Sequence, residues 1–196
     1  MRAHWPRCSA VVCLVVYALV STSPPAVAQG DVPPYGSLTD KRVRFRPLRL
    51  GDTARMDVPQ RDWRAVFGVG TLLAILTPKK GAVTVFVEEV PLNVPIEEDD
   101  MDHTYEAVQT EAITSDDAGA ANVRHWFLPR GDRKVLIISF LRNRPLGTEH
   151  VTAYVINART RLYRLVCITP AAERAAYAPL FGHMAASIVV SAAPVR

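Results

Sequence analysis

The sequence predicts an α+β domain in which helices pack on an antiparallel β-sheet. Three observations carry this prediction. Short apolar or alternating segments recur along the chain, and tight turns join many of them, which is typical of antiparallel hairpins. One amphipathic helical pattern interrupts these segments in the middle of the chain. A second helical region follows the last of them.

Composition and charge exclude several classes of protein. The chain has 196 residues, 49% of them hydrophobic and 21% charged, with a formal net charge of +4. This profile excludes collagen and disulfide-rich mini-proteins, and a long disordered chain would be less hydrophobic and more highly charged. The net charge is too small to indicate nucleic-acid binding, so we expect no nucleic-acid partner.

Residues 1–28 have the three parts of a secretory signal peptide. Arg2 and Arg7 precede an apolar run of 11 residues, Ala10–Val20, and an Ala-Val-Ala cleavage site follows at 26–28. A membrane span needs about 20 apolar residues, so this run is short for an anchor, although an uncleaved anchor is the alternative. We therefore predict a periplasmic or secreted protein whose mature chain has no transmembrane segment.

Cysteine usage fits an exported protein that relies on its hydrophobic core. Cleavage after Ala28 removes Cys8 and Cys13 and leaves Cys167 alone, so the mature chain forms no internal disulfide. Cys167 alternates with Leu165 on one face of a predicted strand, which predicts a buried, inert thiol. A reactive nucleophile is the alternative interpretation.

The mature chain opens with a leader and a basic strand. Residues 29–40 contain Pro and Gly without periodicity and predict a flexible leader, so the predicted single domain spans residues 41–196. Lys41–Leu50 alternates apolar with basic residues, which predicts a half-buried edge strand that Pro47 stops. Its outward face carries Arg42, Arg44 and Arg46. Charges on an edge strand discourage aggregation, and contact with an anionic surface or an acidic partner is the alternative.

Further strands precede the first helical pattern. They are Ala54–Val58, Trp63–Phe67, Thr71–Leu76 and Val83–Val90. Each is rich in β-branched, aromatic or other apolar residues, and Pro, Gly or a Pro-Lys-Lys-Gly turn separates it from the next.

A helix is predicted to follow these strands. Pro95 can occupy its first turn, and the acidic run Glu97–Asp102 offsets the helix dipole at that end. Binding of a hard cation is the alternative for this run, but the ligand spacing of a calcium loop is missing. The helix has one apolar stripe, formed by Met101, Tyr105, Val108 and Ala112.

A four-stranded meander and a closing helical region complete the pattern. The meander strands are Asn122–Leu128, Lys134–Leu141, Glu149–Asn157 and Arg161–Ile168. Val135–Ile138 is apolar on both faces, which predicts a central strand covered on both sides. The closing region starts at Thr169-Pro170, and Pro179 is expected to begin a second helix after a short turn. One face of this region carries Tyr177, Phe181, Met184 and Ile188.

This order of elements resembles the Mog1/PsbP-like fold, including bacterial secreted proteins of the DUF1795/DcrB kind. The resemblance rests on Met56–Pro59 with Asp62-Trp63, Val83–Glu89, the meander, and the closing residues Phe181, Met184, Ser187 and Ile188. The family's closing helix has the pattern Phe-x-x-Ile-x-x-Ser-Phe, so Met184 and Ile188 depart from it. The resemblance implies an α/β/α sandwich, a binding or assembly role without catalysis or cofactor, and a Trp63 largely buried beneath the closing helix.

No residue is assigned to a catalytic, cofactor-binding or metal site. Ser139 and Ser187 lack the Gly-x-Ser-x-Gly context of a nucleophile elbow. We therefore predict an exported, non-enzymatic binding or assembly module of the cell envelope, whose partner is another envelope protein or a small ligand. The alternative is a metal-binding protein or hydrolytic enzyme that uses His103, His125 and His150, should these side chains converge.

Overall fold

The computed structural model describes residues 43–115, 117, 119–131 and 133–191. The predicted signal peptide and leader, together with Lys41 and Arg42, lie outside these residues and remain predictions. In chain order the elements are β1 (Phe45–Leu50), β2 (Ala54–Pro59), β3 (Trp63–Phe67), β4 (Leu72–Pro78), β5 (Thr84–Pro91), the 3₁₀ turn η1 (Glu98–Asp100), α1 (His103–Thr114), β6 (Ala121–Arg130), β7 (Arg133–Arg144), β8 (Gly147–Asn157), β9 (Arg161–Pro170), η2 (Ala171–Glu173), α2 (Arg174–Ala186) and β10 (Val189–Val190).

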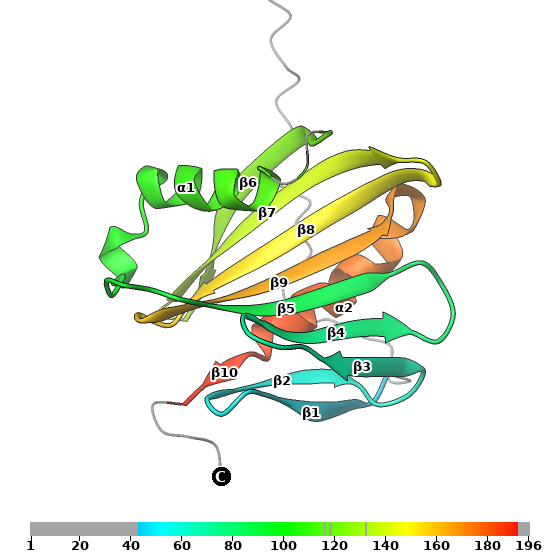
Figure 1. Ribbon diagram of the computed structural model, residues 1–196, viewed down its shortest axis with the longest axis horizontal. Helices are drawn as coiled ribbons and strands as arrows, with labels where there is room; N and C mark the ends of the chain where they lie inside the picture. Colours follow the sequence, from blue (N-terminus) through cyan, green and yellow to red (C-terminus); the bar gives the residue numbers. More distant parts are fainter. Residues whose placement is uncertain (1–42, 116, 118, 132, 192–196) are drawn as a thin grey trace, which may run out of the picture. The chain divides into compact units, whose positions relative to one another are not determined.

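The main sheet has seven strands in the order β3-β4-β5-β9-β8-β7-β6, and every neighbouring pair is antiparallel (Figure 1). Strands β6 to β9 form the predicted meander. β5 extends it by pairing with β9, where Val85 stands opposite Cys167. The α+β class and the antiparallel sheet with two helices are therefore confirmed.

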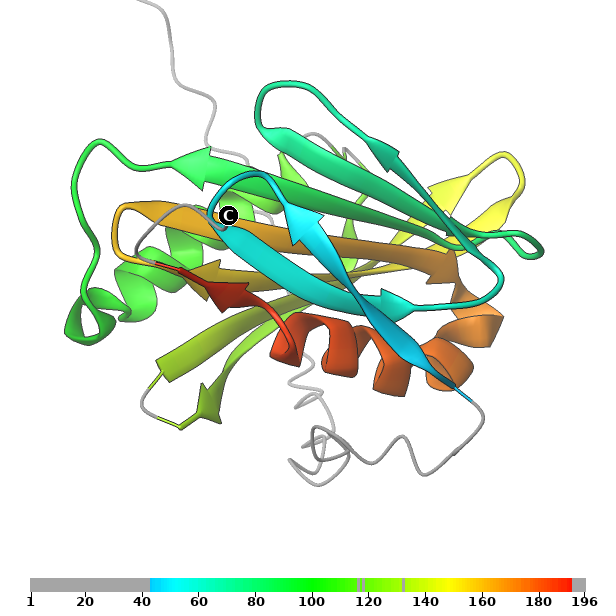
Figure 2. The ribbon, with the colours of Figure 1, turned by 90° about the horizontal axis from the view of Figure 1, so that it is seen from below.

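The opening strands form a separate small sheet. It has the order β1-β2-β10, and the short β10 pairs with the start of β2 (Figure 2). Residues of β1, β2 and α2 share one hydrophobic core with one face of the main sheet, which we call the inner face. The layer on the inner face is therefore built from a helix and strands together.

The opposite face of the main sheet, which we call the outer face, carries α1 and its own core. The strand β7 serves both cores, because Val135 and Ile137 lie in the inner one and Leu136 and Ile138 in the outer one. Coverage on both faces is confirmed. The central position is wrong, however, because β7 lies next to the edge strand β6 and β9 occupies the middle of the order.

The first helix begins later than predicted. Pro95 precedes η1, and α1 starts at His103 with Asp102 as its N-cap. The Asp102 carboxylate accepts hydrogen bonds from the backbone N–H groups of Thr104 and Tyr105, at 2.8 and 3.0 Å. Free N–H groups in the first turn favour such a cap, so one residue of the acidic run fixes the helix start.

The predicted apolar stripe of α1 is only partly correct. Met101 and Tyr105 are buried, but Val108 is 55% exposed and Ala112 is also exposed. Two polar side chains, Glu106 and Gln109, are buried in their place. The helix is rotated relative to the predicted stripe because the outer face offers polar partners for these two residues.

Two prolines do not break their elements. β1 continues through Pro47, which is exposed and stands opposite Asp57 in the register with β2. β1 is an edge strand, so a proline nitrogen that faces away from β2 removes no ladder bond. The closing region is one helix, α2, which runs through Pro179 after the turn η2. Burial of its apolar face against both sheets outweighs the local cost of proline, about 3 kcal/mol.

Thr169-Pro170 ends β9 rather than starting the helix. The apolar face of the closing region is confirmed, because Phe181, Met184 and Ile188 are buried and Tyr177 packs against the same core. Trp63 is only partly buried, since it lies on β3, the last strand of the main sheet.

Candidate binding surfaces

The three histidines of the alternative hypothesis do not converge. His103 begins α1, and its Nδ1 lies 3.2 Å from the Glu106 carboxylate; the Nδ1 of His125 on β6 lies 2.6 Å from the same carboxylate. His150 belongs to the inner face, where it bonds to Ser139. A site that uses all three histidines is therefore not formed.

Glu106, His103 and His125 form a polar cluster on the outer face, which we call the outer cluster, and Glu106 is its centre. Its side chain is buried beneath α1, whereas the His103 side chain is fully exposed and that of His125 is partly exposed. Burial alone would raise the pKa of Glu106, but hydrogen bonds from His125 and His103 lower it overall. The cluster therefore holds a carboxylate that attaches α1 to the edge of the main sheet.

Ser139 and His150 form a buried pair that looks like a nucleophile and its base. Ser139 Oγ lies 3.0 Å from His150 Nε2, and His150 Nδ1 lies 3.2 Å from Thr152 Oγ1. Burial, with the Arg174 charge, lowers the pKa of His150 to about 4. A hydroxyl in place of a carboxylate gives little stabilisation to an imidazolium, so this pair lacks the means to activate the serine.

Cys167 is buried, as predicted. Its side chain is 1% exposed on the inner face of β9, and burial raises the pKa of the thiol. The predicted burial is therefore confirmed, and the inertness of the thiol stays a prediction.

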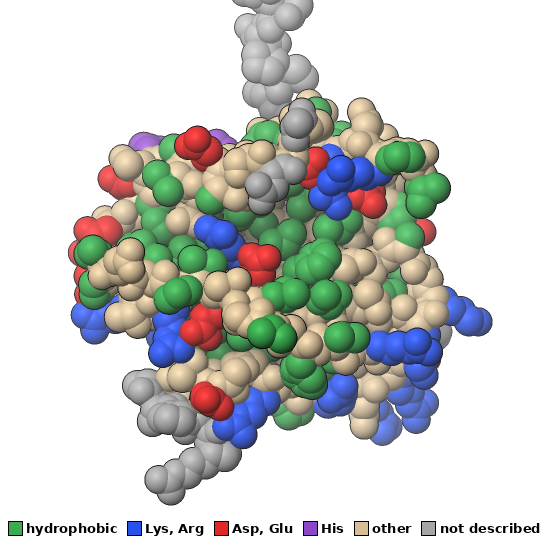
Figure 3. All heavy atoms as spheres, viewed as in Figure 1, with side chains coloured by type: hydrophobic (Ala, Val, Ile, Leu, Met, Phe, Trp, Pro, Cys, Tyr) green, Lys and Arg blue, Asp and Glu red, His purple; other side chains and the backbone are tan. Residues whose placement is uncertain are grey.

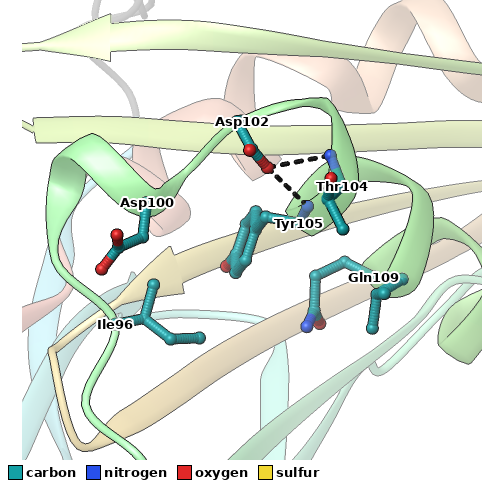
Figure 4. A pocket seen from close by; sticks show the side chains of 7 residues that line it. Ile96, Asp100, Asp102, Thr104, Tyr105 and Gln109 are labelled. Atoms are coloured by element: carbon teal, nitrogen blue, oxygen red, sulfur yellow. Dashed lines mark hydrogen bonds between the residues drawn. The ribbon is translucent and has the colours of Figure 1, made fainter.

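A shallow hollow of about 430 Å³ lies beside the start of α1 (Figure 4). Tyr105 and Gln109 point into this region from α1, and Gln109 Oε1 accepts a 2.9 Å hydrogen bond from Arg164. Within the described part of the chain, the Tyr105 hydroxyl and the Arg164 Nε have no partner. Both donors are sealed beneath the helix, so we assign no function to this hollow.

A second hollow, of about 520 Å³, lies where several turns meet. Arg133, Arg159 and Arg161 line it together with Glu97 and Glu98. Arg159 forms an ion pair with Glu97. The Arg161 Nη1 atom lies 2.6 Å from Oε1 of Glu89, which does not itself line the hollow. The charges are largely balanced, so the hollow favours no single ligand class.

The outer face is open where β3, β4 and β5 lie. The register places Val66, Ile75, Phe86 and Val166 opposite one another on four neighbouring strands. Residues that stand opposite each other share a face of the sheet, so the four form one apolar row, which we call the open row. Val66 is 63% exposed and the other three are half-buried. Figure 3 shows hydrophobic side chains gathered on this side of the molecule.

Basic residues border the open row. Arg61, Arg64 and Lys80 are exposed next to β3. Arg44 and Arg46 are also exposed, but they lie at β1 of the small sheet on the inner side. Blue side chains gather on the side of Figure 3 where these strands lie. Contact with an anionic surface through Arg42, Arg44 and Arg46 remains a prediction, with Arg42 outside the described residues.

Sequence reasoning missed the open row. The four segments that carry it are all predicted as strands, but an apolar residue on a strand does not reveal whether a helix covers it. The weak signal in the sequence is the short segment around Val66, which lies between Arg64 and the glycines at 68 and 70. A short strand next to glycines is typical of a sheet edge.

Of three comparisons with known proteins, the one with solved structures places the fold. No protein-family model matches the chain, and no curated protein matches it. Among solved structures, cyanobacterial PsbP (CyanoP) from Synechocystis sp. PCC 6803 matches with a TM-score of 0.60 and 12% identity, over 81% of this chain and 98% of that one. The Ran-binding protein Mog1p of Saccharomyces cerevisiae matches with a TM-score of 0.54 and 10% identity, over 76% and 96%.

A third solved structure is LpqN, involved in cell envelope biogenesis of Mycobacterium tuberculosis. It matches with a TM-score of 0.49 and 11% identity, over 81% of this chain and 99% of that one. The first two matches show that the chain has a Mog1/PsbP-like fold. In the part of the chain that the structure covers, no helix is both long and apolar enough to span a bilayer.

Proposed function

We propose that this chain is an exported, non-enzymatic binding or assembly module of the cell envelope that docks a partner protein on the open row. The observation that carries this proposal is the apolar row Val66, Ile75, Phe86 and Val166, in which Val66 is exposed and Val166 joins the row to the outer core. Contiguous exposed apolar surface is costly in water, and proteins that keep it use it for interaction. The row is bordered by cations, which favours a partner with acidic residues at its rim.

Two further observations support the proposal. The first 28 residues have the pattern of a signal peptide, which favours export. Mog1p, which shares this fold, is a Ran-binding protein, so the fold is able to present a protein-binding surface. The DUF1795/DcrB kind is the finer identification that we favour.

The absence of catalysis is supported by how the polar groups are used. Ser139 and His150 are buried against each other, and Glu106 is engaged by two histidines. Each of these groups has a structural partner, and none of them lines either hollow. A catalytic acid, base or nucleophile must instead reach its substrate.

Site-specific photocrosslinking in the native host tests the docking surface. A benzoylphenylalanine replaces Phe86 in the open row, and a matched variant carries it at Leu146, an exposed hairpin residue. We expect one reproducible protein adduct from position 86 and none of that mass from position 146. Equal capture at both positions, or no adduct from position 86, would overturn the proposal.

Export is tested separately by fractionation and N-terminal sequencing. We expect the mature protein outside the cytoplasm, beginning at Gln29. Detection of any of residues 1–20 in the exported form would contradict cleavage at this site.

A further inference from the structure

The edge of β3 presents a row of backbone groups. Lys79 N–H donates to the Asp62 carbonyl at 2.7 Å, and Gly68 N–H donates to the Leu73 carbonyl at 3.2 Å. Antiparallel partners alternate between bonded and non-bonded pairs, so Arg64 and Val66 also bond to β4. The N–H and C=O groups of the intervening residues Trp63, Ala65 and Phe67 therefore point away from the sheet.

No described strand pairs with these outward groups, because β3 ends the order of the main sheet. The other strand edges carry features that discourage pairing. β1 contains Pro47, and β6 contains Pro129 and an irregular register between Ala121 and Arg124. β3 has neither a proline nor a bulge against β4. It is the regular edge, although its length of five residues is short.

The side chains around this edge favour a particular partner. Phe67 is 64% exposed and Val69 is 93% exposed, next to Val66 of the open row. Arg61, Arg64 and Lys80 are exposed, and none of them makes an ion pair with a described residue. Lys79 alone is paired, with Asp62 at 3.7 Å. Uncompensated cations beside an apolar edge are complementary to a segment that alternates acidic with apolar residues.

We propose that β3 accepts an extended acidic segment of a partner protein by β-strand addition, with the apolar side chains of that segment lying beside the open row. The backbone groups of Trp63, Ala65 and Phe67 supply the hydrogen bonds, and the exposed turn cations Arg61 and Lys80 select acidic side chains. Arg64 shares the outer face with Val66, where its stem borders the apolar side chains of the added segment. This inference rests on the proposed docking function and specifies how the partner binds.

The test uses the purified chain and two synthetic probes, acetyl-(Glu-Val)₃-Glu-amide and its lysine counterpart acetyl-(Lys-Val)₃-Lys-amide. We expect the acidic peptide to bind about tenfold more tightly than the basic one. It should slow hydrogen exchange at the outward amides of Trp63, Ala65 and Phe67, while the amides of β6 stay unchanged as an internal control. Protection confined to β6, or equal affinity for both peptides, would overturn the proposal.

A proline variant separates strand addition from simple surface contact. Ala65→Pro removes one outward N–H and leaves the bonds to β4 in place, and Ala65→Val is the control that keeps this N–H. We expect Ala65→Pro to weaken acidic-peptide binding about tenfold and Ala65→Val to leave it within about twofold. Should Ala65→Pro fail to fold, an acidic peptide N-methylated at alternate residues replaces it, and we expect that peptide not to bind.

The remaining outcomes also decide the matter. Unchanged binding by Ala65→Pro or by the methylated peptide contradicts strand addition, and so does failure of the acidic peptide to bind at millimolar concentration. Binding to phosphatidylglycerol vesicles in place of the acidic peptide would identify a membrane-facing surface instead. A specific crosslink from position 86 together with unchanged Ala65→Pro binding would keep the docking function and reject strand addition alone.

Discussion

The two faces of the main sheet are covered by helices of different character. On the inner face, α2 contributes Phe181 and Met184, and the following Ile188 packs beside them; all three are less than 5% exposed. On the outer face, the buried residues of α1 are Tyr105, Glu106 and Gln109. Apolar burial therefore stabilises the packing of α2, whereas both apolar and polar contacts stabilise the packing of α1.

This difference has a physical consequence. Hydrophobic burial is non-directional and tolerates small shifts, but the bonds from Glu106 to His125 and from Arg164 to Gln109 require their geometry. The outer helix is thus placed over β6 to β9 by directional contacts. The rest of the outer face stays free, which is where the open row lies.

The largest expected effect is on the inner face. Met184 is completely buried, so Met184→Ala removes packed side-chain atoms and should lower the free energy of unfolding by about 2–5 kcal/mol. Val108→Ala on the exposed side of α1 is the control and should change it by less than about 0.5 kcal/mol. Urea denaturation measures both, and equal effects would erase the contrast between the faces.

The inner face should also respond to mild acid through His150. Its pKa is about 4 in the folded chain against an ordinary 6.5, so between these values the unfolded chain binds a proton that the native chain does not. The free energy of unfolding is then fully retained above pH 6.5 and falls toward pH 4, by at most about 1.4 kcal/mol per pH unit. His150→Gln should flatten this dependence in pH-dependent denaturation, and an unchanged slope would exclude His150 as its source.

Substitution in the outer cluster should have a smaller effect on the free energy of unfolding. Glu106→Gln removes the carboxylate that engages His125 and His103 and should cost about 1–3 kcal/mol. Glu111→Gln, an exposed position on the same helix, is the matched control and should be nearly neutral. Because the folded pKa of Glu106 is lowered from 4.5, its contribution is present above pH 4.5 and is lost as the pH falls through the folded pKa. Equal denaturation midpoints for the two variants would contradict a stabilising role of the Glu106 carboxylate.

The smallest effect on stability is expected at Cys167. The thiol is buried with a raised pKa, so native protein should resist a thiol reagent that labels the unfolded chain rapidly. Cys167→Ala removes a single sulfur atom from the inner core and should cost about 1 kcal/mol. Rapid labelling of native protein, or a disulfide-linked dimer on a non-reducing gel, would contradict this burial.

Local patterns were sufficient for much of the fold. Tight connectors such as Arg144–Gly147 permit only a hairpin between their strands, so the antiparallel meander followed from the sequence. The apolar run Val135–Ile138 predicted burial on both faces of its strand, and the alternation around Cys167 predicted burial of the thiol. Both patterns act over a few neighbouring residues. The pair of His125 and Glu106 could not be predicted, because the two residues lie on different elements and only packing brings them together.

Propensity rules failed where tertiary contacts outweighed them. Pro179 lies within α2 because the buried Phe181 and Met184 hold the helix against the sheets on the far side of the proline. Val108 belongs to an apolar stripe in the sequence yet is exposed, because the outer face pairs polar groups with Glu106 and Gln109. In both cases the decisive energy comes from residues distant in the chain.

The sequence by itself determined which segments become strands and helices, since alternation, helical spacing and turn residues act over a few neighbours. Only the tertiary structure decided which strand ends the main sheet and which part of the outer face remains uncovered. β3 and β5 are both predicted as apolar strands, yet β5 pairs on both sides and β3 on one. Pairing order depends on contacts between segments far apart in the chain, and a strand's own residues do not encode its position in the sheet.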